Sequence, residues 1–159
     1  MIHVVFVCLG NICRSPLAEG VFKDLVQKAK LSGVISVDSS ATSTWEIGNN
    51  PDYRTLANAK SHGIILEHKA KQFTAADYER ANYVLVMDKS NLENIKPLIG
   101  NSADGYAKLQ LFRTYDPLGM GEVPDPYHGT AADFEQTYQI INRCAIGLFE
   151  HIVKQHNLV

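Results

Sequence analysis

The chain has 159 residues, of which 45% are hydrophobic and 20% charged, as in folded globular domains, and we expect one domain over residues 1–159. Its formal net charge of −2 argues against nonspecific nucleic-acid binding. No apolar run approaches the ~18 residues of a membrane span, and the first residues do not resemble a secretory signal peptide. Three cysteines are too few for a disulfide framework, so we expect reduced thiols and a cytoplasmic location.

Short apolar runs and helical patterns alternate along the chain. The apolar runs predict strands over residues 3–7, 34–38, 83–87 and 108–112. Helical spacing and start signals predict helices over residues 16–30, 52–61, a short segment after Thr74, the segment from Ser90 to Ile99, and residues 131–155. Ser15, Thr74 and Ser90 are the expected N-caps, and Gly63 is expected to follow the second helix. This alternation predicts an α/β three-layer sandwich, with a central four-stranded parallel sheet and helices on both faces.

Three loops are expected to meet at one edge of this sheet, because each follows the carboxyl end of a strand. The first begins at Cys8. The second, residues 39–51, contains the only tryptophan, Trp45, and the third, residues 113–129, contains Asp125. A lone tryptophan in a polar loop is more often a packed anchor, although it can also form the exposed wall of a ligand cleft.

The segment from Cys8 to Arg14 combines a thiol, a tight turn and a guanidinium at the expected start of a helix. Backbone N–H groups of such a turn bind anions, and Gly10 and Asn11 are residue types that accept the positive φ that the turn requires. Arg14 supplies a fork of donors that matches two phosphate oxygens. The same positive field favours the thiolate of Cys8, which is the nucleophilic form. The pattern therefore predicts a phosphate-binding loop with a nucleophile rather than a buried structural cysteine.

The segment from Val7 to Pro16, VCLGNICRSP, resembles the signature of the low-molecular-weight protein-tyrosine phosphatases. The sequence Asp125-Pro126-Tyr127 resembles that family's second motif, and the resemblance extends over essentially the whole chain. It implies a two-step phosphoryl transfer in which Cys8 attacks phosphorus, Arg14 holds the phosphate, and Asp125 acts as general acid and then base. It implies no metal and no cofactor. The implied partners are tyrosine-phosphorylated proteins, and we expect a monomer or weak self-association.

The resemblance also implies roles for the residues around these three. Phosphate-binding groups are implied at Leu9, Gly10, Asn11, Ile12, Cys13, Arg14 and Ser15, with the Ser15 hydroxyl stabilising the thiolate. A network that supports the loop is implied for Asn11, Ser15, Ser39 and His68. A substrate cleft is implied for Trp45, Tyr127 and His128. His128 stands where many members carry a second tyrosine, and it would make binding at the rim sensitive to pH.

Some alternatives stay open at this point. Cys13 either forms a reversible disulfide with Cys8, as the resemblance implies, or packs beneath the loop; Cys144 is expected to be inert. A thioredoxin-coupled arsenate reductase shares this type of loop, but it needs further cysteines to relay a disulfide. A phosphate-binding module without turnover would predict loss of Cys8 or Asp125, and both are present.

Overall fold

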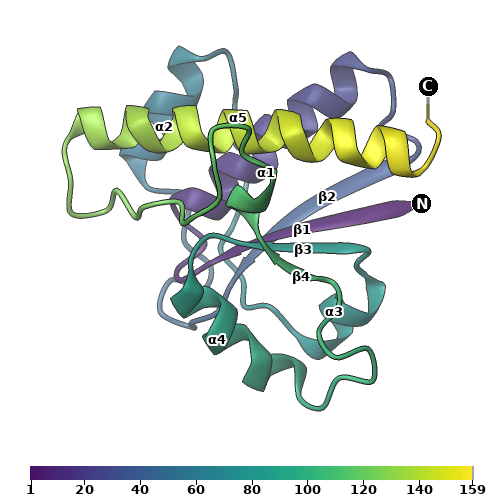
Figure 1. Cartoon of the computed structure of the whole chain (residues 1–159). Coiled ribbons are helices and arrows are strands. Elements are labelled where there is room, and N and C mark those ends of the chain that lie inside the picture. The colour runs from purple at the N-terminus through teal and green to yellow at the C-terminus, as the bar shows by residue number, and fades with distance from the viewer. Residues whose placement is uncertain (159) are drawn as a thin grey trace.

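Four parallel strands form the centre of the computed structural model, which describes residues 1–158 (Figure 1). The strand order is β2-β1-β3-β4, and this is the predicted α/β sandwich. The strands are β1 (Ile2–Cys8), β2 (Ile35–Ala41), β3 (Tyr83–Val86) and β4 (Leu109–Leu111). The helices are α1 (Arg14–Lys28), α2 (Tyr53–Ser61), α3 (Ala75–Arg80), α4 (Lys89–Ile99) and α5 (Ala131–Gln155), and a 3₁₀ turn, η1, covers Phe112–Tyr115.

The helices divide between the two faces of the sheet, as Figure 1 shows. Val4 and Phe6 of β1 pack in the core shared with α1 and α5, whereas Val5 and Val7 pack in the core shared with α3 and α4. Successive side chains of a strand point to opposite faces, so a central strand covered on both sides needs apolar residues at every position. This explains why β1 is a continuous apolar run. Within residues 1–158, no helix combines the length and apolarity needed to cross a membrane.

The register of the sheet brings the carboxyl ends of three strands together. Cys8, the last residue of β1, pairs with Ala41 at the end of β2. On its other side Val7 pairs with Val86, the last residue of β3. The residues that follow these strands therefore start from the same edge of the sheet, as the sequence predicted.

Several element boundaries differ from the predictions. The capping box at Thr74 and the positive φ of Gly63 are confirmed. Ser15 is not an N-cap: α1 begins at Arg14 and its N-cap is Cys13, which places Ser15 inside the first turn. Ser90 is not an N-cap either, because the Asp88 carboxylate accepts the capping hydrogen bond from the backbone N–H of Asn91.

The strands and the first helix also end differently from their predicted bounds. β2 continues to Ala41, so Ser39 lies in a strand rather than in a loop. β4 stops at Leu111 because Phe112 begins η1. α1 ends at Lys28, earlier than predicted.

Candidate active site

The loop between β1 and α1 turns sharply at Asn11, which has a φ of 58°. Asparagine tolerates this left-handed conformation better than most residues do. Of the two residue types that accept a positive φ, Gly10 and Asn11, only Asn11 adopts one in this loop. A Cβ at Gly10 would instead lie 3.5 Å from Cγ of Glu46, an ordinary contact with the neighbouring loop. One strained residue is therefore sufficient to turn the chain from the sheet into the helix.

The Cys8 thiol lies at the base of this loop, where it is buried and surrounded by hydrogen-bond donors. Its Sγ lies 3.0 Å from Oγ of Ser15 and accepts a hydrogen bond of 3.3 Å from the backbone N–H of Asn11. Ser15 occupies this position because the first turn of α1 points its hydroxyl back toward the strand. The sulfur therefore lies within hydrogen-bond distance of a hydroxyl of α1 and a backbone amide of the loop.

The Arg14 guanidinium is buried, and three groups from other parts of the chain lie against it. Its Nη1 donates to Oδ2 of Asp88 at 2.7 Å and to the carbonyl oxygen of Val123 at 3.0 Å. Its Nη2 lies 3.5 Å from Oδ2 of Asp125. Burial lowers the pKa of Arg14, but Cys8, Asp88 and Asp125 outweigh burial and raise that pKa overall. The guanidinium therefore stays charged, and Asp88, which sequence reasoning left out of the site, fixes its orientation.

The predicted supporting residues meet beneath the loop in a network that we call the Asn11 network. The Asn11 side-chain amide donates to Oγ of Ser15 at 2.8 Å and to Oγ of Ser39 at 3.0 Å. Its Oδ1 lies 2.6 Å from Nε2 of His68 and accepts the backbone N–H of Lys71 at 3.1 Å. Asn11 thus bonds to two elements and one loop segment, which holds its left-handed backbone in place.

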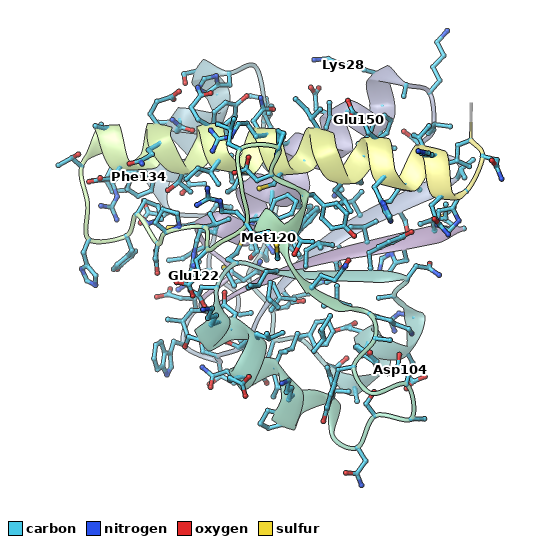
Figure 2. The ribbon with its side chains drawn as sticks, in the orientation of Figure 1. Lys28, Asp104, Met120, Glu122, Phe134 and Glu150 are labelled. Atoms are coloured by element: carbon cyan, nitrogen blue, oxygen red, sulfur yellow. The ribbon has the colours of Figure 1, made fainter. Side chains whose placement is uncertain are left out.

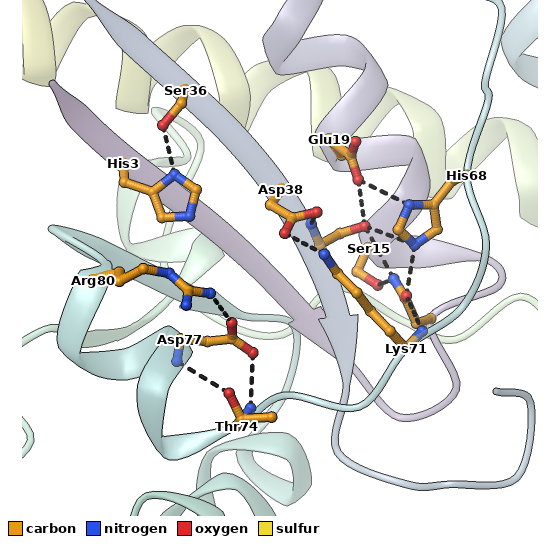
Figure 3. Close-up of polar contacts among 12 residues, drawn as sticks. His3, Ser15, Glu19, Ser36, Asp38, His68, Lys71, Thr74, Asp77 and Arg80 are labelled. Carbon is orange, nitrogen blue, oxygen red and sulfur yellow. Dashed lines mark hydrogen bonds and ion pairs between the residues drawn. The ribbon is translucent and has the colours of Figure 1, made fainter. Parts of the chain in front are cut away.

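Glu19 completes the Asn11 network and was missed by sequence reasoning (Figure 3). It is buried on α1, its Oε1 accepts a hydrogen bond of 2.6 Å from Ser39, and the same oxygen lies 3.4 Å from Nδ1 of His68. Burial lowers the pKa of His68, and the Glu19 carboxylate opposes this effect. The available signal was position, because Glu19 follows Ser15 by one helical turn and therefore shares its face of α1.

One group within residues 1–158 has the geometry to hold a metal ion. Ligand atoms of Glu19, Asp38 and His68 lie within 4.8 Å of one another. Both carboxylates are already paired with ammonium groups. The Lys23 ammonium lies 2.5 Å from Glu19, and that of Lys71 lies 2.5 Å from Asp38, as Figure 3 shows for the second pair. A metal ion at this position would have to displace these two lysines.

A cleft of about 210 Å³ opens above the loop. Its floor is formed by the loop residues other than the buried Asn11, namely Cys8, Leu9, Gly10, Ile12, Cys13 and Arg14. Its rim is formed by Trp45, Glu46, Asp125, Tyr127 and His128. Of the two interpretations of Trp45 that the sequence left open, the structure shows the exposed wall of a cleft, because its side chain is 76% exposed at the rim. The Tyr127 ring is partly exposed and meets the His128 ring edge-on, with centroids 5.0 Å apart. The three loops predicted to share one side of the sheet therefore do so.

The three cysteines are free thiols with different surroundings. Cys13 is buried at the N-cap of α1, and burial raises the pKa of its thiol to about 12. Burial likewise raises the pKa of Cys144, inside α5, to about 12. In this structure Cys13 is a buried free thiol that lines the same cleft as Cys8.

The fold and the spacing of Cys8 and Arg14 fit the class of phosphatases that carry a Cys-x5-Arg loop. A family model described as low molecular weight phosphotyrosine protein phosphatase matches residues 3–158. The chain belongs to this family, as its motifs predicted, and is an enzyme of the hydrolase class.

Individual relatives agree with this assignment. The chain is 46% identical over 147 residues to the low molecular weight phosphotyrosine protein phosphatase of Gallus gallus, covering 92% of this chain and 93% of that protein. Among solved structures, the protein tyrosine phosphatase of Entamoeba histolytica with Hepes in its active site has a TM-score of 0.90 at 27% identity, over 100% of both chains. YfkJ of Bacillus subtilis also has a TM-score of 0.90, at 34% identity over 98% of this chain and 96% of its own.

Proposed function

We propose that this enzyme hydrolyses phosphotyrosine in proteins, and small aryl phosphates, through a cysteinyl-phosphate intermediate. The observation that carries the proposal is that one cleft holds the thiol of Cys8, the guanidinium of Arg14 and the carboxylate of Asp125. These are the nucleophile, the anion clamp and the proton donor that two-step phosphoryl transfer needs. Phosphotyrosine, the substrate in the printed name of the Gallus gallus relative, is a phosphate ester that these three groups can hydrolyse.

In the first step the Cys8 thiolate attacks phosphorus in line with the leaving oxygen. The S–P bond forms as the bond between phosphorus and the tyrosine oxygen breaks, and Asp125 gives its proton to the departing phenolate. Backbone N–H groups of residues 9–14, together with the fork of Arg14, bind the three equatorial oxygens. Donors that are already oriented lower the barrier, because they need no reorganisation as charge spreads over these oxygens.

In the second step water replaces the thiol. The Asp125 carboxylate takes a proton from the attacking water, the O–P bond forms, and the S–P bond breaks. The electron pair of that bond returns to sulfur, where the Ser15 hydroxyl, 3.0 Å away, donates to the leaving thiolate. Inorganic phosphate then leaves, and the enzyme returns to its starting state.

The rim of the cleft supports a preference for aryl groups. Trp45 and Tyr127 offer aromatic faces at its mouth, and stacking against such faces favours a phenyl ring over a short alkyl chain. Tyrosine-phosphorylated proteins are accordingly the proposed partners. We also propose a reducing, cytoplasmic compartment, because the cysteines are free thiols. A single domain that is monomeric or weakly associating remains the expectation from the sequence.

The arsenate reductase alternative is less well supported, because it needs accessible thiols to relay a disulfide. Cys13 and Cys144 are buried, and burial raises the pKa of each thiol to about 12. A protein that only binds phosphate, without hydrolysing its ester, would have no use for Asp125, whose carboxylate lies 3.5 Å from the Arg14 guanidinium.

The test measures phosphate release from p-nitrophenyl phosphate and from a phosphotyrosine peptide. We expect Cys8→Ser to abolish release and Asp125→Ala to lower kcat by about 10²- to 10⁴-fold. Asp24→Ala is the control, because Asp24 pairs only with Lys28 on the surface of α1. A wild-type enzyme that releases no phosphate, or a Cys8→Ser variant that still does, overturns the proposal. Arsenate-dependent oxidation of thioredoxin would support the reductase instead.

A further inference from the structure

The first turn of α2 supports the phosphate-binding loop from below. The backbone N–H of Asp52 donates to the carbonyl oxygen of Ile12 at 2.8 Å. The side chain of Thr55, in the same turn, is buried. The Asp52 contact connects a helix that carries none of the proposed catalytic groups to the outer half of the loop.

Arg54, in the same turn, is held in one orientation by its neighbour. Its Nε donates to Oδ1 of Asp52 at 3.0 Å, and its Nη2 donates to Oδ2 of the same carboxylate at 2.9 Å. This hydrogen-bonded contact lowers the pKa of Asp52, so the pair is ionic at neutral pH. A bidentate pair of this kind fixes the plane of a guanidinium more strongly than a single contact does.

The fixed guanidinium faces the aromatic wall of the cleft. Its carbon lies 5.3 Å from the centroid of the Tyr127 ring, 4.7 Å from that of Phe134 and 5.8 Å from that of Tyr53. Phe134 is buried near the start of α5, where Figure 2 labels it. Arg54 therefore lies between a ring anchored in the core and a ring at the rim, at distances where a cation attracts both faces.

We propose that Arg54 is a positioning residue that fixes Tyr127 as the wall for the aryl group of the substrate. The inference rests on the proposed function in one respect, namely that Tyr127 contacts the substrate ring. Tyr127 lies on a loop with little regular structure, and its backbone N–H donates only to Asp125. Without the guanidinium its ring would sample more rotamers, and ordering it again would weaken aryl binding.

The first test separates binding of the ring from binding of the phosphate. Titration calorimetry measures the Kd of benzylphosphonate, which carries both groups, and of inorganic phosphate, which carries one. We expect Arg54→Gln to weaken benzylphosphonate about 3- to 10-fold and to leave phosphate unchanged. Arg54→Lys keeps a cation without the fork and should restore part of the loss. Arg80→Gln is the matched control, because Arg80 pairs with Asp77 on α3.

The second test asks whether the effect passes through Tyr127. In a Tyr127→Ala background, Arg54→Gln should cause no further loss of benzylphosphonate affinity. In turnover of p-nitrophenyl phosphate, Arg54→Gln should raise KM and leave kcat unchanged.

Two results would overturn the proposal. Equal weakening of both ligands would show that α2 only supports the loop, and an unchanged Kd for benzylphosphonate would show that Tyr127 needs no positioning. A wild-type enzyme that binds benzylphosphonate but fails to hydrolyse aryl phosphates would refute the proposed function, while the ratio of the two Kd values would still report on Arg54.

Discussion

Two buried polar clusters in this protein differ in composition and in the role that we infer for each. The Asn11 network lies beneath the cleft and joins Asn11, Ser15, Ser39, His68 and Glu19. The second cluster lies between η1 and α5, where Asp116 accepts 3.1 Å hydrogen bonds from Arg113 and Arg143. Most members of the first cluster are neutral, whereas the second is a carboxylate between two guanidinium groups.

The difference lies in what each cluster leaves free. In the second, the Asp116 side chain is wholly buried and both its oxygens are used within the cluster, including one by the backbone N–H of Leu118. In the first, the side chains bond to one another and hold the loop, so its backbone N–H groups, apart from that of Asn11, are left for a phosphate. We infer that the second cluster stabilises the fold and the first shapes the site.

The largest effect is expected from Asp116→Asn, which leaves two guanidinium groups without their carboxylate. Removing one partner of a buried ion pair costs about 3–5 kcal/mol, so the free energy of unfolding should fall by that amount. The kcat/KM of the folded protein should change little. Urea unfolding at neutral pH measures the first quantity, and turnover at low temperature the second. A loss of kcat/KM without a loss of stability would invert the assignment of the two clusters.

The same variant carries a pH signature. Burial alone raises the pKa of Asp116, but the hydrogen bond from Arg143 and the charge of Arg113 outweigh burial and lower this pKa below the ordinary value for an aspartate. A lowered folded-state pKa gives stability that is present above the unfolded pKa and is lost as the pH falls through the folded one. The difference in the free energy of unfolding between wild type and Asp116→Asn should therefore stay constant from about pH 7 to about pH 5 and decrease below about pH 4.

An intermediate effect is expected from Ser39→Ala within the Asn11 network. This change removes the hydroxyl that accepts a hydrogen bond from Asn11 and donates one to Glu19. The loss of these two hydrogen bonds should lower the free energy of unfolding by about 1–2 kcal/mol. Because the loop loses part of its support, kcat/KM should fall about 10-fold. Ser36→Ala is the control, because Ser36 lies on the same strand and contacts His3 away from the cleft. Equal kinetic losses in both variants would mean that the effect comes from the strand rather than from the network.

The smallest effect is expected in the chemistry of the buried thiols. Because burial raises the pKa of Cys13 and of Cys144 to about 12, both thiols are protonated at neutral pH and should react very slowly with iodoacetamide. In a Cys8→Ser variant, mass spectrometry should find the chain unmodified. Rapid modification of Cys13 would instead show that the loop opens in solution and would revive the Cys8–Cys13 disulfide.

The strand and helix types were predictable because they depend on local patterns, whereas several boundaries depend on distant partners. Residues 39–41 are polar or small, but they continue β2 because β1 lies alongside them, and Ala41 also bridges to Gln72. No local pattern contains that pairing. The N-cap of α4 was mistaken for a related reason, since Asp88 and Ser90 are equally good caps by residue type.

The site divides in the same way. Cys8 and Arg14 are close in sequence, so their chemistry was visible in one short motif. The roles of Asp88 and Glu19 were not, because each depends on a contact with a residue from another element. Residue type and loop composition alone left Trp45 either as a packed anchor or as a cleft wall, because they do not reveal that a cleft lies beside it.

The position of β1 at the centre of the sheet has a consequence for local unfolding. Cys8 ends a strand that is paired on both sides, whereas Asp125 belongs to a loop whose Val123 N–H bonds to the carbonyl oxygen of Met87 at 2.8 Å. Central strands open only with the whole domain, while loops with few backbone hydrogen bonds open at low free-energy cost. If only this loop opens, Asp125, the proposed proton donor, leaves the cleft, while Cys8, the proposed nucleophile, stays in the phosphate-binding loop. The two halves of the proposed chemistry thus rest on parts of the molecule with different local stabilities.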